Sequence, residues 1–200
     1  GSSMGIFQFE SQGMTNFMKE LKPDCLEDLI AGVSLYRPGP MDQIPRYIAN
    51  KKDPDHAVYT HPALKPILKV TYGCMVYQEQ VMQIVRDLAG YSLGRADLVR
   101  RAMGKKKLDV MAKEREIFIH GQVDDNGNVV VPGCVRNGID EQSANKIFDE
   151  MAEFAKYAFN KSHAACYAVV AYRTAYLKAY YPAEFMAATL NSFLGNLDKV

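Results

Sequence analysis

The chain is 200 residues long, 48% of its residues are hydrophobic, and its formal net charge at pH 7 is +1. This length suits one large domain or two small ones, and the apolar share is sufficient for a buried core. The near balance of charges excludes a general attraction to polyanions, so any affinity for phosphate groups must come from local clusters of basic residues.

Neither end of the chain has the sequence features that mark the natural start or end of a protein. Residues 1–4, which begin Gly1-Ser2-Ser3, are interpreted as a remnant of recombinant expression, and residues 5–200 as the protein proper. The abrupt beginning and end indicate a piece of a longer protein. Further on, Tyr36-Arg37-Pro38-Gly39-Pro40 predicts a stiff turn between helices. Residues 51–61 are charged and contain proline, so we expect an exposed loop there.

Most of the remaining chain has the apolar spacing of amphipathic helices. One helix is predicted over residues 78–88, with Gly90 as its C-cap, and a second runs from the N-cap Ser92 to Met103. Asp140 is expected to cap a third helix. The apolar residues of this helix keep their spacing without a break: Ala144, Ile147, Phe148, Met151 and Ala155.

Two further helices follow toward the end of the chain. Ser162 is predicted to cap a helix that ends near Ala179, and because Ala and Tyr occupy nearly every face of it, we expect it to be buried. Pro182 suits the first position of the last helix. The residues predicted to face inward from that helix are Phe185, Met186, Thr189, Leu190 and Phe193.

One stretch interrupts the helical pattern. Ile117-Phe118-Ile119 and Val129-Val130-Val131 flank a turn that contains Asn126-Gly127, which is a strong hairpin signal. We therefore expect a two-stranded insertion near residues 117–135. The predicted fold class is mainly α, a multi-helix domain with a small β-hairpin insertion.

Cysteine and histidine are too widely spaced for a metal site. The cysteines, at Cys25, Cys74, Cys134 and Cys166, form no Cys-x-x-Cys pair, and the four histidines are equally scattered. We expect free thiols in a reducing compartment, and no metal or cofactor bound by this chain. No apolar run reaches the roughly 20 residues that a membrane helix needs, and no signal peptide is visible, so we expect a cytoplasmic location and no membrane partner.

The basic run Arg100-Arg101-Ala102-Met103-Gly104-Lys105-Lys106-Lys107 ends the second predicted helix. Helical spacing puts Arg100 and Arg101 on the polar face together with Asp97. Guanidinium forks suit phosphate oxygens and lysines add point charge, so the run is a candidate phosphate site. Taken alone, the run is better explained as a solvated basic helix end, which the helix dipole favours. No Gly-x-x-x-x-Gly-Lys-Ser/Thr pattern occurs, so it is not a P-loop.

The segment Phe159-Asn160-Lys161-Ser162-His163 gathers amide, hydroxyl and imidazole donors, an ammonium group and an aromatic ring, and Tyr157 lies just before it. These groups suit a sugar and a phosphate, and either ring offers a stacking face for a base. If Ser162 opens the helix, free backbone amides point to the same place and suit an anion. A capped helix start with a hydrophobic staple explains the same residues equally well.

Candidate contacts to a nucleotide or to DNA are Arg37, Tyr77, Gln78, Tyr157 and Phe159. Arg37 is fixed on the stiff turn, and Tyr77 and Gln78 open a predicted helix. In isolation, a structural turn and a helix start with packed aromatic rings are the stronger interpretations. No pair of carboxylates suited to catalysis or magnesium binding is evident.

Together, these motifs resemble one family, the alpha subunit of bacterial DNA polymerase III, the replicative polymerase of family C. The matching stretches span nearly the whole chain. In order they are Gly5-Ile6-Phe7-Gln8-Phe9-Glu10-Ser11, residues 36–40, Tyr72-Gly73, Val76-Tyr77-Gln78-Glu79-Gln80-Val81-Met82-Gln83, Ala89-Gly90-Tyr91-Ser92-Leu93-Gly94, residues 100–107, Asn137-Gly138-Ile139, residues 159–164 and Tyr181-Pro182-Ala183-Glu184-Phe185-Met186.

The resemblance implies the fingers domain, the mostly helical part of the polymerase that follows the palm and holds the incoming deoxynucleoside triphosphate (dNTP) against the template base. It places residues 159–163 near the sugar and base of that nucleotide. The implied partners are dNTP, primed-template DNA, the palm of the same parent chain and, through that chain, other replisome subunits. The residues that the resemblance assigns to the triphosphate are Arg100, Arg101, Lys105, Lys106 and Lys107.

Two departures limit what the resemblance carries over. The catalytic aspartates of the palm lie upstream in the family and are absent here, so this chain alone is expected to be inactive, and Mg²⁺ is expected in the palm of the parent enzyme. Many relatives run almost directly from the helix near Glu116 into Asn137-Gly138-Ile139, so the hairpin is typical of a subset of the family. A different class of function stays open, a non-enzymatic helical module that binds single strands or partner proteins.

Overall fold

The structure is a computed structural model of the chain and describes residues 2–105 and 107–195. Within these residues it is mainly helical with one two-stranded antiparallel sheet, which confirms the predicted fold class. Short 3-10 helices lie at Pro40–Gln43, Pro54–His56, Pro62–Leu64 and Lys69–Thr71. The strands are β1 (Gln122–Val123) and β2 (Val129–Val131). The α-helices are α1 (Gln12–Leu21), α2 (Leu26–Leu35), α3 (Ile44–Lys52), α4 (Lys65–Leu68), α5 (Gln78–Ala89), α6 (Leu93–Gly104), α7 (Leu108–His120), α8 (Gly133–Arg136), α9 (Glu141–Phe154), α10 (Lys161–Tyr180) and α11 (Pro182–Ser192).

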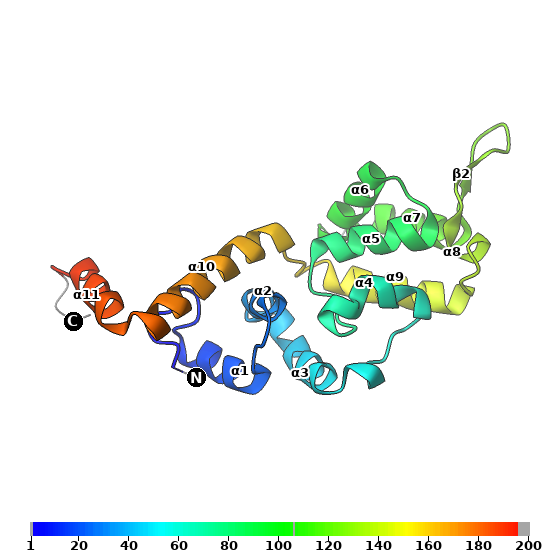
Figure 1. Ribbon diagram of the computed structural model, residues 1–200. Coiled ribbons are helices and arrows are strands. Elements are labelled where there is room, and N and C mark those ends of the chain that lie inside the picture. The colour runs from blue at the N-terminus through cyan, green and yellow to red at the C-terminus, as the bar shows by residue number, and fades with distance from the viewer. Residues whose placement is uncertain (1, 106, 196–200) are drawn as a thin grey trace. The chain divides into compact units, whose positions relative to one another are not determined.

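The chain forms two compact units. One unit is Arg37–Lys161, and it contains α3 to α9 and the hairpin. The other combines the chain up to Tyr36 with the chain from Ser162 onward, and it contains α1, α2, α11 and all of α10 except its first residue (Figure 1).

The interpretation of residues 1–4 as an expression remnant stays a prediction. In the structure, the backbone oxygens of Ser2 and Met4 accept hydrogen bonds from Lys178.

The core of the Arg37–Lys161 unit is built largely by helices that the sequence predicts. α5 ends at Gly90, whose left-handed φ of 78° lets its N–H donate to the carbonyl of Arg86. Ser92 caps α6 and Asp140 caps α9, and each side chain accepts a backbone N–H of the first turn. The five apolar residues predicted for the α9 segment are buried. The buried positions on α5, at helical spacing, are Gln80, Val81, Ile84, Val85, Leu88 and Ala89.

The hairpin is present, but its first strand is not where the sequence predicts it. β1 pairs with β2, and Asp124 closes the turn by accepting the N–H groups of Asn126 and Asn128. Residues 117–119, predicted as a strand, form the last turn of α7 instead. Their side chains are buried, and the ring of Phe118 lies 5.7 Å from that of Phe148 between centroids. Packing against the core thus overrides the β propensity of these residues. In Figure 1 the hairpin projects near α7 and α8.

The unit formed by the two chain ends corrects the prediction for the last two helices. α10 buries only a narrow stripe, Ala164, Ala168 and Ala171, whereas Tyr172 and Tyr180 are 54% and 69% exposed. Small residues at this spacing let α10 pack along one side while the large rings project away from the core. The prediction for α11 is also corrected, because this helix buries none of its residues. Of the residues predicted to face inward from α11, Met186 and Leu190 are exposed, and Phe185, Thr189 and Phe193 are partly buried.

The four cysteines are free thiols, as predicted. Burial raises the pKa of Cys74 to about 11 and that of Cys134 to about 12. Both thiols therefore stay protonated and behave as small core residues. None of the helices among the described residues has the length and apolar character needed to cross a membrane.

Candidate functional site

Arg100 and Arg101 share a single carboxylate on α6. Asp97 Oδ1 accepts hydrogen bonds from Arg100 Nε at 3.1 Å and from Nη2 at 2.6 Å, and Asp97 Oδ2 lies 2.7 Å from Arg101 Nε. This sharing follows from the i,i+3 and i,i+4 spacing of the three residues. Hydrogen bonding to Arg100 holds the pKa of Asp97 below its usual range. Two guanidinium groups therefore keep one net positive charge and point from the same side of the helix.

The lysines of the basic run lie at the C-terminal end of α6. Lys105 and Lys107 are exposed, and their backbone N–H groups donate to the carbonyls of Arg101 and Ala102. Lys106 lies outside the described residues. A helix C-terminus favours cations through its dipole. The position is thus compatible both with a solvated helix end and with a phosphate-binding cluster, and the two interpretations of this run stay open.

Residues 157–161, hereafter the 157–161 segment, lie against the N-terminus of α5. The N–H of Gln78 donates to the carbonyl of Phe159 at 2.9 Å, and Tyr77 forms an isolated parallel bridge with Phe159. The side chain of Gln78 makes a second link, because its Oε1 accepts a hydrogen bond from Arg100 Nη1 at 3.1 Å. Gln78 therefore connects the 157–161 segment to the arginines of α6. Tyr77 is buried, which agrees with its interpretation as a packed aromatic ring at the helix start.

Glu79, the next residue of α5, fixes the far end of the same segment. Its Oε1 accepts a hydrogen bond from Asn160 Nδ2 at 2.9 Å, and its two oxygens accept from the Lys161 N–H at 3.1 and 3.0 Å. The ammonium of Lys161 lies 5.2 Å from the centroid of the Tyr77 ring, within cation–π range. The carboxylate thus satisfies the first backbone donor of α10, and this helix begins at Lys161. The prediction that Ser162 caps it was wrong.

Arg37 holds the near end of the segment. Its guanidinium lies 4.1 Å above the centroid of the Phe159 ring and donates from Nη2 to the carbonyl of Tyr157 at 3.0 Å. Burial lowers the pKa of Arg37. The predicted stiff turn is present, since Gly39 has a φ of 100° and a Cβ there would overlap the Tyr157 ring. Tyr157 is itself 46% exposed, so part of this residue is open to solvent.

The structure thus brings most of the predicted site residues together in one unit and leaves two of them in the other. Ser162 and His163 belong to the unit formed by the chain ends, where the ring of His163 lies 4.3 Å from that of Tyr167 between centroids. The residues that meet in the Arg37–Lys161 unit are Arg37, Tyr77, Gln78, Arg100, Arg101, Tyr157, Phe159, Asn160 and Lys161. Sequence reasoning did not assign Glu79 to the site, although its carboxylate contacts two of these residues.

A cavity of about 300 Å³ lies beside this arrangement but has the wrong charge for a phosphate. Three carboxylates and one guanidinium line its polar wall, so an added anion would meet net repulsion. A triphosphate is better matched by the arginines of α6. The charged residues that line the cavity are Asp42, Arg46, Glu150 and Glu153.

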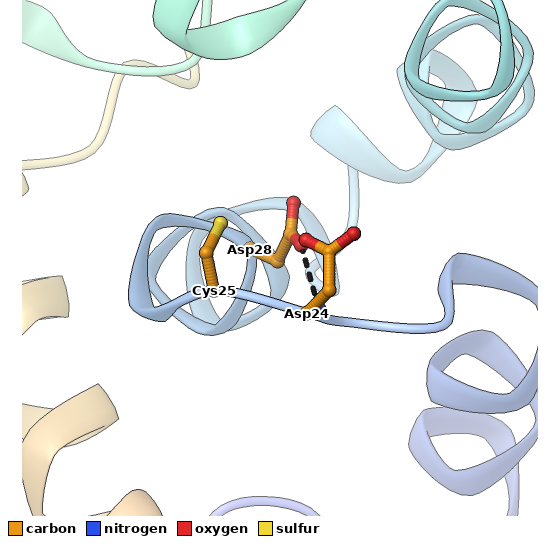
Figure 2. A group of neighbouring side chains, drawn as sticks. All are labelled: Asp24, Cys25 and Asp28. Atoms are coloured by element: carbon orange, nitrogen blue, oxygen red, sulfur yellow. Dashed lines mark hydrogen bonds between the residues drawn. The ribbon is translucent and has the colours of Figure 1, made fainter.

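Among the described residues, one group has donor atoms close enough together to hold a metal ion. Asp24, Cys25 and Asp28 lie at the start of α2, and their donor atoms all fall within 4.8 Å of one another (Figure 2). Asp28 is buried, and its Oδ2 accepts the backbone N–H of Asp24 at 3.1 Å. This bond secures the residues that precede α2, as capping interactions do. A thiol beside an engaged carboxylate does not fit the oxygen ligands that Mg²⁺ requires.

Residues 1–126 match the family model described as bacterial DNA polymerase III alpha subunit finger domain. All 200 residues align with the DNA polymerase III subunit alpha of Xylella fastidiosa at 56% identity. The subunits named alike from Rickettsia felis and Chlamydia trachomatis are each 52% identical over 100% of this chain. The chain covers 16%, 16% and 15% of these three relatives, so it spans about a sixth of their length.

Proposed function

The chain belongs to the bacterial DNA polymerase III alpha subunit finger domain family, and from this premise we propose that it binds and positions the incoming dNTP in template-directed DNA synthesis. The parent polymerase would add this nucleotide to a primer 3′ end. In that step the 3′-hydroxyl loses its proton to water and its oxygen bonds to the α-phosphorus. The bond from the α-phosphorus to the oxygen that bridges the α- and β-phosphates breaks, and pyrophosphate leaves with that oxygen. The contribution proposed for this chain is to hold the triphosphate and the base in place for the step.

The observation that supports this proposal best is the junction made by Gln78. It joins the guanidinium of Arg100 to the 157–161 segment through one side-chain and one backbone hydrogen bond. Groups suited to phosphate binding and to base stacking, about 60 positions apart in the chain, thereby contact the same helix start. A solvated basic helix end alone gives no reason for this link.

The proposed roles follow the chemistry of each group. Arg101 is more exposed than Arg100 and pairs with Asp97 through its Nε, so its Nη groups suit phosphate oxygens. Lys105 and Lys107 add positive charge at the end of the same helix, and Lys106 is proposed to join them. For the sugar and the base, the proposed contacts are Tyr157, Phe159, Asn160, Lys161, Ser162 and His163, with Arg37, Tyr77 and Gln78 as their supports.

Phosphoryl transfer also needs metal ions, and the one candidate ligand group among the described residues does not fit Mg²⁺. The group at Asp24, Cys25 and Asp28 mixes a thiol with a carboxylate that already caps the chain before α2. We therefore propose that Mg²⁺ is held by the palm of the parent chain and that this chain alone is inactive. Template DNA, the palm and other replisome subunits are its proposed partners, and the cytoplasm is the proposed compartment.

A second candidate, a helical module that binds other proteins or single strands, is favoured by one observation. Tyr172, Tyr176 and Tyr180 project from α10 with 54%, 44% and 69% of their surface exposed. Exposed rings at helical spacing can stack on bases or pack against a partner. The upstream coding sequence discriminates between the two candidates, because a palm with clustered aspartates would support the polymerase and a stand-alone reading frame would support the module.

Steady-state primer extension by the parent polymerase tests the proposal. The double variant Arg100→Ala/Arg101→Ala should raise the KM for dNTP, whereas Arg86→Ala, an exposed arginine of α5 paired with Asp87, should leave it unchanged. Titration of this chain with a primed template across a salt series adds a physical readout, since phosphate contacts weaken steeply with salt. Unchanged KM in the double variant would sink the assigned role.

A further inference from the structure

We propose that Glu79 is a positioning residue of the nucleotide site, one that holds Asn160 and Lys161 in register with Gln78 and Arg100. This inference rests on the proposed function and names a residue outside the site predicted from the sequence. Glu79 is the second residue of α5, and its partners lie 81 and 82 positions further along the chain. The contact is therefore made by the fold and not by local sequence.

The carboxylate of Glu79 accepts from two donors, in three contacts at normal hydrogen-bond distances. Oε1 accepts from Asn160 Nδ2 at 2.9 Å and from the Lys161 N–H at 3.1 Å, and Oε2 accepts from the same N–H at 3.0 Å. Hydrogen bonds to an ionised acceptor are about twice as strong as neutral ones. A single side chain thus fixes both the amide of Asn160 and the first backbone donor of α10.

The electrostatic setting favours a carboxylate at this point. Glu79 lies in the first turn of α5, where the helix dipole stabilises negative charge. The Lys161 N–H belongs to the first turn of α10, which offers the same stabilisation and would otherwise lack an intrahelical acceptor. Two helix starts therefore share one negative charge, and this holds the 157–161 segment against α5.

The neighbouring residue, Gln78, links the same segment to Arg100 on α6. Gln78 Oε1 accepts a hydrogen bond from Arg100 Nη1 at 3.1 Å, and the Gln78 N–H donates to the carbonyl of Phe159 at 2.9 Å. With Glu79 in place, the segment is bound to α5 at both Phe159 and Asn160. Without Glu79, the bond from the Gln78 N–H remains, but Asn160 Nδ2 and the Lys161 N–H lose the carboxylate that accepts from them. The distance from Asn160 and Lys161 to Arg100 would then vary.

The same geometry indicates where the triphosphate does not bind. The helix start at Lys161 already holds an anion of the protein, so a phosphate there would have to displace Glu79 and would meet its charge. Arg100 and Arg101 share one carboxylate, Asp97, and so keep a net positive charge, to which the exposed Lys105 and Lys107 add. We therefore place the triphosphate on the α6 side of Gln78, and Asn160 and Lys161 toward the rest of the nucleotide.

The test uses primer extension by the full-length parent polymerase. Glu79→Ala should raise the KM for dNTP on the order of tenfold, because it removes hydrogen bonds to a charged acceptor. Glu79→Gln keeps the shape of the side chain and one carbonyl acceptor, so its KM for dNTP should lie between those of the wild type and Glu79→Ala. This variant also keeps the test valid if the alanine variant misfolds. Asp87→Asn, which changes an exposed carboxylate on the same helix, is the matched control and should leave the KM unchanged.

A double-mutant cycle separates positioning from a general structural role. If Glu79 acts through Asn160, Glu79→Ala should cost much less in kcat/KM when Asn160 is already alanine. Fully multiplicative effects, or a Glu79→Ala variant that matches the Asp87→Asn control while Arg100→Ala raises the KM, would overturn this inference and leave the proposed function standing. An unchanged KM in Arg100→Ala would instead contradict the proposed function, whatever Glu79 does.

Discussion

Gln78 Oε1 accepts a hydrogen bond from Arg100 Nη1 at 3.1 Å, and this one contact gives two adjacent arginines different roles. Arg100 is held by both Gln78 and Asp97, and its side chain is 23% exposed. Arg101 shares only Asp97 with it, and its side chain is 62% exposed. The first arginine therefore belongs to the framework of the site, and the second is presented to solvent.

This difference predicts that the two arginines separate stability from nucleotide binding. Arg101→Ala should raise the KM for dNTP in the parent polymerase and should change the free energy of unfolding by less than about 1 kcal/mol, as for other exposed ion pairs. Arg100→Ala should raise the KM and also lower the free energy of unfolding by about 1.5–3 kcal/mol, since it removes hydrogen bonds between charged groups. Equal losses of stability in thermal unfolding of the two variants would contradict this division.

Asp97 predicts a pH dependence of stability. Hydrogen bonding to Arg100 lowers its pKa in the folded chain below the value in the unfolded chain. The resulting stabilisation is fully present above the unfolded pKa, roughly 3.9 for aspartate, and is lost as the pH falls through the folded value. Asp97→Asn should therefore lower stability at neutral pH and weaken its decline below about pH 4.

Urea unfolding measured from pH 7 to pH 3 checks the expectation for Asp97. The control is Asp109→Asn, which changes an exposed carboxylate in the first turn of α7. Parallel pH curves for wild type and Asp97→Asn would show that the shared carboxylate contributes nothing to acid sensitivity.

Gln80 predicts a cost for an apolar substitution of similar size. Its Oε1 accepts the N–H groups of Val76 and Tyr77 at 2.9 and 3.0 Å, and its Nε2 donates to Thr71 Oγ1 at 2.8 Å. The side chain is 5% exposed, so Gln80→Leu would leave buried donors without an acceptor, at about 1–3 kcal/mol for each group. Chemical denaturation should show a loss of several kcal/mol, and Gln80→Glu, which keeps the acceptors, should retain more stability than Gln80→Leu.

Local patterns carry enough information for the helices that build the core. The caps at Ser92 and Asp140 and the glycine at Gly90 act within four residues of themselves, so spacing and residue type suffice to predict them. The same holds for the pairing of Asp97 with Arg100 and Arg101, because residues three and four apart meet on a helix surface.

Contacts between distant residues could not be predicted in this way. Nothing near Glu79 indicates that its carboxylate meets Asn160, which is 81 positions away. Residues 117–119 have strand-like composition, yet they complete α7 because their side chains fill the core beside Phe148. The tyrosines of α10 give an apolar pattern on every face, but only its small residues are buried. For residues 117–119 and for α10, tertiary packing thus overrode the structure that the local sequence predicted.

The cysteines predict a measurable test of how closed the core of the Arg37–Lys161 unit is. Cys25 and Cys166 are exposed, whereas Cys74 and Cys134 are 1% and 0% exposed, with pKa values raised by burial to about 11 and about 12. Because the thiolate is the reactive species, an aromatic disulfide reagent at pH 7 should modify two thiols of the native chain quickly and all four only in denaturant. Burial also raises the pKa of Cys25, so its thiol should react more slowly than a free cysteine. Cys166→Ser should reduce the fast phase from two thiols to one, and rapid modification of Cys134 in the native chain would show that the helices around it open readily.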